Sequence, residues 1–289
     1  MAFKLNKLLQ AYQPDIIIST HPFGSQMCSY LKKKGKIHSI IATVMTDYAP
    51  HNQWLVGNAY ISYFFVAHQG MKEQLISQGI PSQKIAATGI PLSQKFLSHY
   101  NKEQIIANFG LDFHKKTILF FGGGEFGLGK EKTVAVLKAF IHSFDDIQIV
   151  AISGKNEKMK KAFSDAVEEA GKQSCVKILE YTDKVPELMN ISSLVVTKPG
   201  GLTTTESLAS GLPIVMINPL PGQEEENAMF LESKKVGVWI KKEDNPQEVI
   251  SHLLQSPELL QQMKINAKLL AKKTSTRDIC NILMNTKKD

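Results

Sequence analysis

Residues 193–206 read SLVVTKPGGLTTTE, and the fold can be worked out from this stretch. The apolar run 193–197 predicts a buried strand, the turn at Pro199 and Gly200 ends it, and residues 204–210 predict a helix. A strand followed by a glycine turn and a helix is one βα unit of a parallel sheet. Ligands of such sheets bind at the carboxyl ends of the strands, which is where this turn lies.

Further βα units lie on both sides of this one. The predicted strands are residues 117–121, 147–152, 176–179, 193–197, 213–217 and 236–240. The predicted helices that follow them are 130–143, 156–170, 185–190, 204–210, 225–233 and further helices to the C-terminus. Six units is the number in a complete doubly wound sheet. The sequence therefore predicts a Rossmann-like domain over residues 114–289.

The first part of the chain alternates in the same way but holds fewer strands. Its predicted strands are residues 15–19, 37–45, 61–67 and 84–88, and its predicted helices are 3–12, 24–33 and 70–77. Residues 91–116 are polar and mixed, so we place a domain boundary near residue 113. The predicted fold class is α/β, with a partial Rossmann-like domain at 1–113 before the complete one.

Length and composition exclude several classes of protein. The 289 residues fit two domains of about 150 residues each. No run approaches the roughly 18 apolar residues of a spanning helix, and the first residues lack the features of a secretory signal. The cysteines Cys28, Cys175 and Cys280 are far apart and without metal-ligand spacing, which indicates a reducing compartment. An integral membrane protein, a disulfide scaffold and a zinc module are therefore not expected.

The positive charge of the chain is concentrated in its first part. The net charge is +7, and residues 1–113 hold ten lysines and five acidic residues. A basic face attracts anionic partners, which include nucleic acid, phosphorylated substrates and anionic lipid surfaces. Simple solubility is the alternative interpretation of this charge.

A glycine-rich turn follows the first strand of the second part. Gly122, Gly123 and Gly124 allow the backbone to approach a phosphate closely, and the next helix presents its positive N-terminus there. Together with Gly127 the turn has the GxGxxG spacing of a dinucleotide site. Such a site also needs an acidic residue at the end of the next strand, where residues 151–155 read AISGK. The turn therefore indicates phosphate, and a dinucleotide-dependent oxidoreductase remains an alternative.

Polar side chains follow the strand 193–197 at the same edge of the sheet. Thr203 and Thr204 can cap the helix and offer hydroxyl groups to a phosphate. Glu206 can accept hydrogen bonds from two vicinal hydroxyls, as on a ribose, or can simply stabilise the helix dipole. Two loops of this kind in one sheet indicate a diphosphate ligand.

A third loop, residues 218–228, reads NPLPGQEEENA and also leads from a strand into a helix. An acidic first helical turn explains its three glutamates. It does not explain Gln223 or Asn227, which together with Glu224 could present hydrogen-bonding groups to a sugar.

These three motifs, in this order, resemble those of the GT-B glycosyltransferases that use UDP-sugars. The resemblance is strongest to the diacylglycerol glycosyltransferases, which comprise bacterial processive glucosyltransferases and plant monogalactosyldiacylglycerol synthases. It rests on TKPGGLTTTESLASGLPIV (197–215) and PLPGQEEENAMF (219–230), with VMTDYAPHNQW (44–54) and IAATGIPLSQKF (85–96) in the first part. The resemblance implies a GT-B fold, in which two Rossmann-like domains face a cleft.

The resemblance also implies a UDP-sugar donor site in the second domain. The residues it assigns are Gly122, Gly123, Gly124, Gly200, Gly201 and Thr203 at the diphosphate, Tyr181 and Thr182 at the uracil, Glu206 at the ribose, Gln223, Glu224 and Asn227 at the sugar, and Lys198 as a further donor-binding residue. Members of the family invert the anomeric centre. They need no bound metal and no cofactor, because backbone dipoles and side chains meet the phosphate charge.

The general base that deprotonates the acceptor hydroxyl is expected in the first domain. His21 follows the strand 15–19, and the plant synthases carry a histidine in this motif that is implicated in catalysis, whereas some bacterial relatives have an apolar residue there. Imidazole is suited to this task near neutral pH. Asp47 is a further catalytic candidate, and His51 and Trp54 are candidates for the acceptor groove. The alternatives are a structural histidine and a loop packed between domains.

The function implied is inverting transfer of a hexose from a UDP-sugar to a lipid acceptor such as diacylglycerol. The expected location is cytoplasmic and peripheral, on the inner face of the membrane, with an anionic membrane surface and not nucleic acid as partner. Family members begin with a strand and a glycine-rich loop before the point that matches Pro14, so we expect the first domain to be incomplete. A nucleotide-sugar-binding protein without transferase activity is therefore the alternative function.

Overall fold

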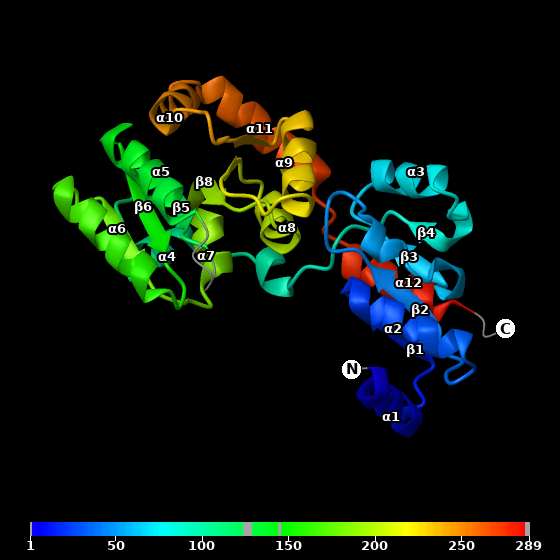
Figure 1. Ribbon diagram of the computed structural model, residues 1–289. Coiled ribbons are helices and arrows are strands. Elements are labelled where there is room, and N and C mark those ends of the chain that lie inside the picture. Colours follow the sequence, from blue (N-terminus) through cyan, green and yellow to red (C-terminus); the bar gives the residue numbers. More distant parts are fainter. Residues whose placement is uncertain (1, 124–128, 144–145, 287–289) are drawn as a thin grey trace. The chain divides into compact units, whose positions relative to one another are not determined.

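The computed structural model describes residues 2–123, 129–143 and 146–286 and divides into two compact units (Figure 1). One unit holds the residues up to Leu92 together with those from Lys272 onward, and the other holds Ser93–Ala271. The division therefore lies about twenty residues before the predicted boundary at 113, and the end of the chain returns to the first unit.

The segment between the two boundaries belongs to the second unit because it is not an extended linker. It forms the short helices η4 (Gln94–Leu97) and α4 (Lys102–Asn108), which pack against α7 (Val185–Ile191). Ile105 of α4 is buried, with 4% of its surface exposed. Among the apolar residues of this mixed segment, the buried Ile105 anchors it to the second unit.

The first unit is built on a parallel sheet with the strand order β1-β2-β3-β4. Its strands are β1 (Ile16–Ser19), β2 (Ile40–Val44), β3 (Tyr63–Phe65) and β4 (Ile85–Ala86). Its helices are α1 (Ala2–Tyr12), α2 (Pro22–Lys33), α3 (Gln69–Ser77) and α12 (Ser275–Met284), with short turns of 3₁₀ helix at η1 (Asn52–Leu55), η2 (Asn58–Tyr60) and η3 (Ser82–Lys84). All four strands lie within the predicted ranges, and the order proceeds in one direction only.

Helix α12 completes the first unit from the far end of the chain (Figure 1). Ile279 and Leu283 lie one turn apart on α12, and they pack against β2 residues and Phe65 of β3. Ser275 at the start of the helix donates a hydrogen bond to the carbonyl oxygen of Gly89 at 2.7 Å. The sequence prediction assigned the C-terminal helices to the second domain, and for α12 the structure differs.

The second unit is the doubly wound sheet that the six predicted βα units require. Its strand order is β10-β9-β8-β5-β6-β7, and all pairs are parallel. The strands are β5 (Lys116–Phe121), β6 (Ile147–Ile152), β7 (Val176–Leu179), β8 (Ser192–Thr197), β9 (Ile214–Met216) and β10 (Gly237–Trp239). The remaining helices are α5 (Lys130–Ser143), α6 (Glu157–Glu169), α8 (Gly201–Ala209), α9 (Gln223–Ser233), α10 (Pro246–Leu254) and α11 (Pro257–Leu270).

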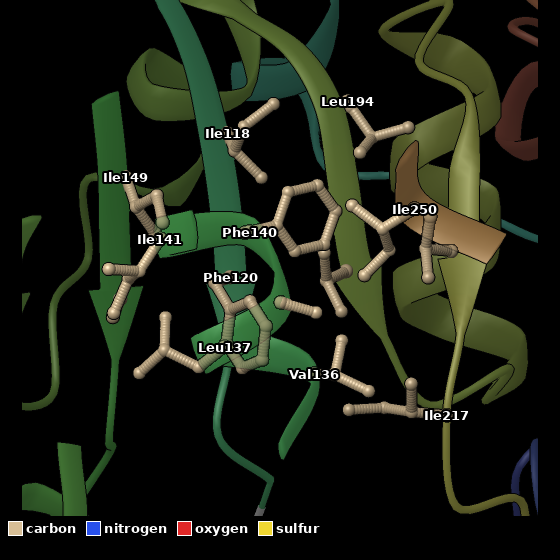
Figure 2. Packing of buried hydrophobic residues seen from close by; sticks show 14 of the residues in the cluster. Ile118, Phe120, Val136, Leu137, Phe140, Ile141, Ile149, Leu194, Ile217 and Ile250 are labelled. Atoms are coloured by element: carbon tan, nitrogen blue, oxygen red, sulfur yellow. The ribbon is translucent and has the colours of Figure 1, made fainter. Parts of the chain in front are cut away.

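The core of the second unit lies between this sheet and helices α5, α6 and α10 (Figure 2). Phe140 of α5 and Phe120 of β5 are fully buried, and their rings meet edge to face with centroids 6.5 Å apart. Phe163 of α6 meets the Phe120 ring in the same geometry at 5.7 Å. Edge-to-face pairs of this kind stabilise a core by about 0.5–1.5 kcal/mol beyond the area they bury. The rigid sheet holds its strand ends in place for the loops that follow.

Candidate active site

The strand order of the second unit creates one place where loops diverge. Strand β5 pairs with both β6 and β8, so the chain leaves it first toward β7 and later returns toward β10. At such a switch point the loops after the two central strands leave in opposite directions and open a crevice in which ligands bind. The glycine turn after β5 and the Pro199–Gly201 turn after β8 flank this point.

The two described glycines after β5 have different roles. A side chain at Gly122 would place its Cβ 2.8 Å from Met159 and 2.9 Å from Phe163, both of α6. Gly122 is therefore needed because α6 packs too closely against the turn to leave room for a side chain. Gly123 has a φ of +91°, and a Cβ there would lie 3.9 Å from Cε of Lys198. The turn after β5 thus approaches the side chain of Lys198, which directly follows β8, whereas Gly124 lies outside the described residues.

Helix α8 begins at Gly201, three residues earlier than predicted. Its N-cap is Gly200, and among the described residues no side chain caps it. The prediction that Thr203 and Thr204 cap the helix is therefore wrong, because both lie within its first turn. The hydroxyl of Thr204 is buried and has no hydrogen-bond partner in the described part of the chain. The first N–H groups of α8 are left for a ligand, and an uncapped helix N-terminus favours a phosphate.

Glu206 lies one turn further along α8. Its carboxyl group is partly buried, and desolvation raises its pKa to about 7 from the ordinary value of 4.5. Burial without compensating hydrogen bonds disfavours the charged form of a carboxyl group. Two hydroxyl donors at this position would favour the carboxylate. Glu206 can therefore bind a ribose as a carboxylate, and without a ligand its raised pKa favours the protonated carboxyl group.

Helix α9 fixes the turn after β8 through a buried amide. Asn227 is fully buried, and its Nδ2 donates to the carbonyl oxygen of Pro199 at 3.0 Å. Glu224 accepts a hydrogen bond from the backbone N–H of Leu220 at 2.6 Å, and a Cβ at Gly200 would lie 3.5 Å from its other oxygen. These contacts give Asn227 and Glu224 positioning roles at the turn, while Gln223 is exposed at the start of α9.

Asn218 is a residue of this site that the sequence pattern did not single out. Its φ is +45°, and its Nδ2 donates to the carbonyl oxygen of Gly129 at 3.0 Å and to the hydroxyl of Thr133 at 2.9 Å. A Cβ at Gly129 would lie 2.3 Å from this side chain. Asn218 therefore joins the loop after β9 to the start of α5. An asparagine directly after a strand was the only signal, and it is a common turn residue.

Tyr181 and Thr182 follow β7, at the same edge of the sheet but beyond β6. Tyr181 is exposed over 72% of its surface, and Nζ of Lys155 lies 5.9 Å from the centroid of its ring. The hydroxyl of Thr182 accepts a hydrogen bond from the backbone N–H of Lys184 at 3.1 Å. The structure therefore brings together the loops after β5, β8 and β9 and leaves this pair further along the edge.

His21 lies at the carboxyl end of β1 and is the N-cap of α2. Its Nδ1 accepts the backbone N–H of Phe23 at 3.3 Å, and its side chain is exposed. In a neutral imidazole that accepts at Nδ1, the proton is on Nε2. The lone pair that could accept a substrate proton is therefore the one that caps the helix. A ring rotation that breaks this long hydrogen bond would free it.

The other first-unit candidates follow β2, the neighbour of β1. Asp47 is buried with 2% of its surface exposed, and its Oδ2 lies 3.7 Å from Nε2 of His51. The Trp54 ring lies 5.8 Å from the His51 ring and is 1% exposed. This burial differs from the predicted place of Trp54 in an acceptor groove, because the indole packs inside the unit. Its Nε1 is buried and has no hydrogen-bond partner within the described residues.

Two further properties of the described residues bear on the site. No described helix combines the length and the apolar composition that crossing a membrane requires. No cluster of three or more His, Cys, Asp or Glu side chains suited to a metal ion is found in the described part of the chain.

Two protein-family models match the chain, one in each part. Residues 1–92 match the model described as monogalactosyldiacylglycerol (MGDG) synthase. Residues 117–280 match the model of the glycosyltransferase family 28 C-terminal domain. The limits of the first match agree with the division between Leu92 and Ser93.

Curated proteins match over nearly the whole chain. A processive diacylglycerol beta-glucosyltransferase of Bacillus pumilus is 35% identical over 276 residues, which is 96% of this chain and 70% of the relative. A protein of the same name from Staphylococcus epidermidis is 36% identical over 287 residues, covering 98% of this chain and 70% of the relative.

Solved structures share the fold at low sequence identity. A UDP-GlcNAc 2-epimerase from Neisseria meningitidis, bound to UDP-GlcNAc, has a TM-score of 0.77 and 17% identity, with 99% of this chain and 80% of that chain covered. Anabaena Alr3699/HepE in complex with UDP has a TM-score of 0.66 and 14% identity, with 99% and 82% covered. These likenesses and the parallel sheets confirm the predicted α/β fold of the GT-B class.

Proposed function

We propose that this chain transfers a hexose from a UDP-sugar to diacylglycerol with inversion at the anomeric carbon. The chain belongs to the family of the diacylglycerol glycosyltransferases and is itself a glycosyltransferase. The observation that carries the proposal is the meeting of three loops at the switch point of the second sheet. There the uncapped start of α8 and the partly buried Glu206 offer the groups that a nucleotide diphosphate and its ribose require.

The donor part of the proposal assigns one task to each loop. Backbone N–H groups at Gly200, Gly201 and Thr203, with the ammonium group of Lys198, stabilise the negative charge that develops on the leaving diphosphate. Gly123 lets the turn after β5 come close to the same phosphates. Tyr181 and Thr182 bind the uracil, and Gln223 at the start of α9 binds the sugar.

The acceptor part rests on the first unit. His21 and Asp47 follow neighbouring strands, so both lie at the carboxyl end of the first sheet. We assign to His21 the removal of the acceptor hydroxyl proton, after its ring leaves the backbone N–H of Phe23. We assign to Asp47 the positioning of His51, whose Nε2 lies 3.7 Å from its Oδ2. The excess of lysine in residues 1–113 supports a cytoplasmic location, with peripheral contact to the anionic inner face of the membrane.

Transfer of radiolabelled glucose or galactose from the UDP-sugar to diacylglycerol in mixed micelles tests this function. The expected result is a labelled glycolipid, together with thermal protection by UDP of about 2.7 kcal/mol when its concentration is 100 times its dissociation constant. The anomeric configuration of the product then tests inversion. UDP protection with no transfer would instead support a nucleotide-sugar-binding protein without transferase activity.

A further inference from the structure

A concave site lies in the first unit, at the opposite end of its sheet from His21 and Asp47. It is a cavity of about 910 Å³. Its lining includes residues that directly precede the strands, namely Asp15 before β1, Ser39 before β2 and Ser62 before β3. The carboxyl ends of parallel strands are the usual place for substrates. This cavity at their amino ends is therefore separate from the proposed acceptor site.

The charged groups of this amino-end cavity are mostly cationic. The ionisable side chains that line it are Lys32, Lys36, Lys84, His38, Asp15, Tyr60 and Tyr63. With the histidine neutral, three ammonium groups face one carboxylate. An excess of two positive charges in a concave site favours a ligand that carries two negative charges.

Two of these lysines are held in place by the backbone. Nζ of Lys32 donates to the carbonyl oxygen of Ser39 at 2.8 Å, and Nζ of Lys84 donates to that of Ile61 at 3.0 Å. Nζ of Lys84 also donates to the carbonyl oxygen of Ala59 at 3.5 Å. An ammonium group has three donor hydrogens, so each lysine keeps at least one for a further acceptor. Ser39 in turn donates to the carbonyl oxygen of Pro14 at 2.6 Å, which ties the segments before β1 and β2 together.

The two held ammonium groups repel each other. Burial lowers the pKa of Lys32, and the positive charge of Lys84 lowers it further. The fold thus keeps two like charges close to each other, where an anion bound between them would remove the repulsion. Charge-assisted hydrogen bonds to phosphate oxygens are about twice as strong as neutral ones.

We propose that this amino-end cavity binds a phosphate ester, with the phosphate group between Lys32, Lys36 and Lys84. Its volume lies in the range of about 300–1,000 Å³ that small-molecule sites occupy. The glutamines Gln10 and Gln13, with Tyr60 at the exposed side, offer hydrogen bonds and an aromatic face to the organic part of the ligand. The proposal does not depend on the transferase activity.

Thermal unfolding in the absence of UDP tests the proposal, because UDP is itself a phosphate ester and would compete for the cavity. The cavity variants then distinguish binding here from binding at the proposed donor site of the second unit. The probes are sn-glycerol 3-phosphate as a free phosphate ester, and phosphatidylcholine vesicles with and without phosphatidylglycerol as the lipid source. We expect one of them to bind, with its affinity lowered at least about 10-fold in Lys36→Gln and more in the double variant Lys32→Gln/Lys84→Gln, since each substitution removes a charge-assisted hydrogen bond to the phosphate.

The matched control is Lys33→Gln/Lys34→Gln, which removes two charges at the same end of α2 from residues that do not line the cavity. Lys36 is exposed, so its variant reports on binding even where the double variant fails to fold. The probe that responds identifies the source as free or membrane-bound. Binding that falls equally in the control and the cavity variants, or no binding of either probe, would overturn the proposal.

Discussion

Ile18 and Val196 occupy the same position in the two units, and their surroundings differ. Each is the last residue but one of a strand that leads through a short loop into a helix. Val196 is fully buried, because β8 pairs with β5 on one side and β9 on the other. Ile18 is 51% exposed, because β1 pairs only with β2 among the described strands. The second sheet is wound in both directions and the first in one. The same sequence pattern therefore places Val196 in a core and Ile18 at a partly exposed surface.

The helices after these two strands differ in a complementary way. The N-terminus of α2 is capped by the imidazole of His21, whereas the cap of α8 is Gly200 and no described side chain fills it. A helix that caps itself has less to offer an anion. The comparison therefore favours the N-terminus of α8 as the diphosphate site. At the N-terminus of α2 the group available to a ligand is the His21 side chain.

The largest expected effect tests the difference in burial between Val196 on β8 and Ile18 on β1. Val196→Asp should lower the free energy of unfolding of the second unit by about 3–5 kcal/mol, because an unpaired charge would be buried. Ile18→Asp, the matched change, should cost less than about 1 kcal/mol at a half-exposed position. Urea denaturation of both variants is the measurement. Equal losses would show that β1 is covered in solution as β8 is.

A second prediction separates the base from the cap at His21. His21→Asn keeps an N-cap side chain and removes the base, so turnover should fall by about 100-fold or more while stability stays unchanged. His21→Ala should lose the same turnover and about 1 kcal/mol of stability. UDP affinity should be unaffected in both variants. Normal turnover in the asparagine variant would leave His21 as a cap alone.

A third prediction concerns the ribose contact at α8. Glu206→Ala should weaken UDP binding by about 10- to 100-fold, because charge-assisted hydrogen bonds of about 1.5–3 kcal/mol are lost. The control is Glu226→Gln on α9, a glutamate in the neighbouring acidic turn. Isothermal calorimetry with UDP measures both. An unchanged affinity in Glu206→Ala would remove this residue from the donor site.

The smallest expected effect is a pH dependence of stability. Since the pKa of Glu206 is about 7 in the folded protein and 4.5 is its ordinary value, protonation favours folding. This contribution is complete below about pH 4.5 and is lost as the pH rises toward 7. Relative to Glu206→Gln, the protein should lose on the order of 1 kcal/mol between about pH 5 and about pH 8, after allowance for solvent screening. If the free energy of unfolding changed with pH in the same way in the wild-type protein and in Glu206→Gln, this prediction would be wrong.

The fold of the second unit could be predicted because its central strands are buried on both faces. Strand β6 is buried along its whole length and has the predicted bounds, and the partly buried edge strand β7 also has the predicted bounds because turn residues enclose it. Helix α12 was predictable as a helix but not as part of the first unit. Its apolar stripe of Ile279 and Leu283 indicates that one face is buried, and nothing in that spacing names the sheet that buries it.

The candidate site was predictable to a different degree in each loop. The glycines and Glu206 stand out because backbone freedom and a carboxyl group directly after a buried strand are typical of a ligand-binding turn. Asn227 and Trp54 do not reveal their burial, because an amide and an indole serve equally in a core or at a surface. Asn218 shows its role only through its contacts with Gly129 and Thr133, which lie far away in the sequence.

The return of α12 makes the second unit an insertion within the first. During synthesis the first unit stays without the helix that covers Phe65 and the neighbouring β2 residues until almost the whole chain has left the ribosome. The inserted unit, whose chain is continuous, can finish folding before it. Removal of the last fifteen residues would then expose the apolar face of the unit that is made first, and would leave the inserted unit intact.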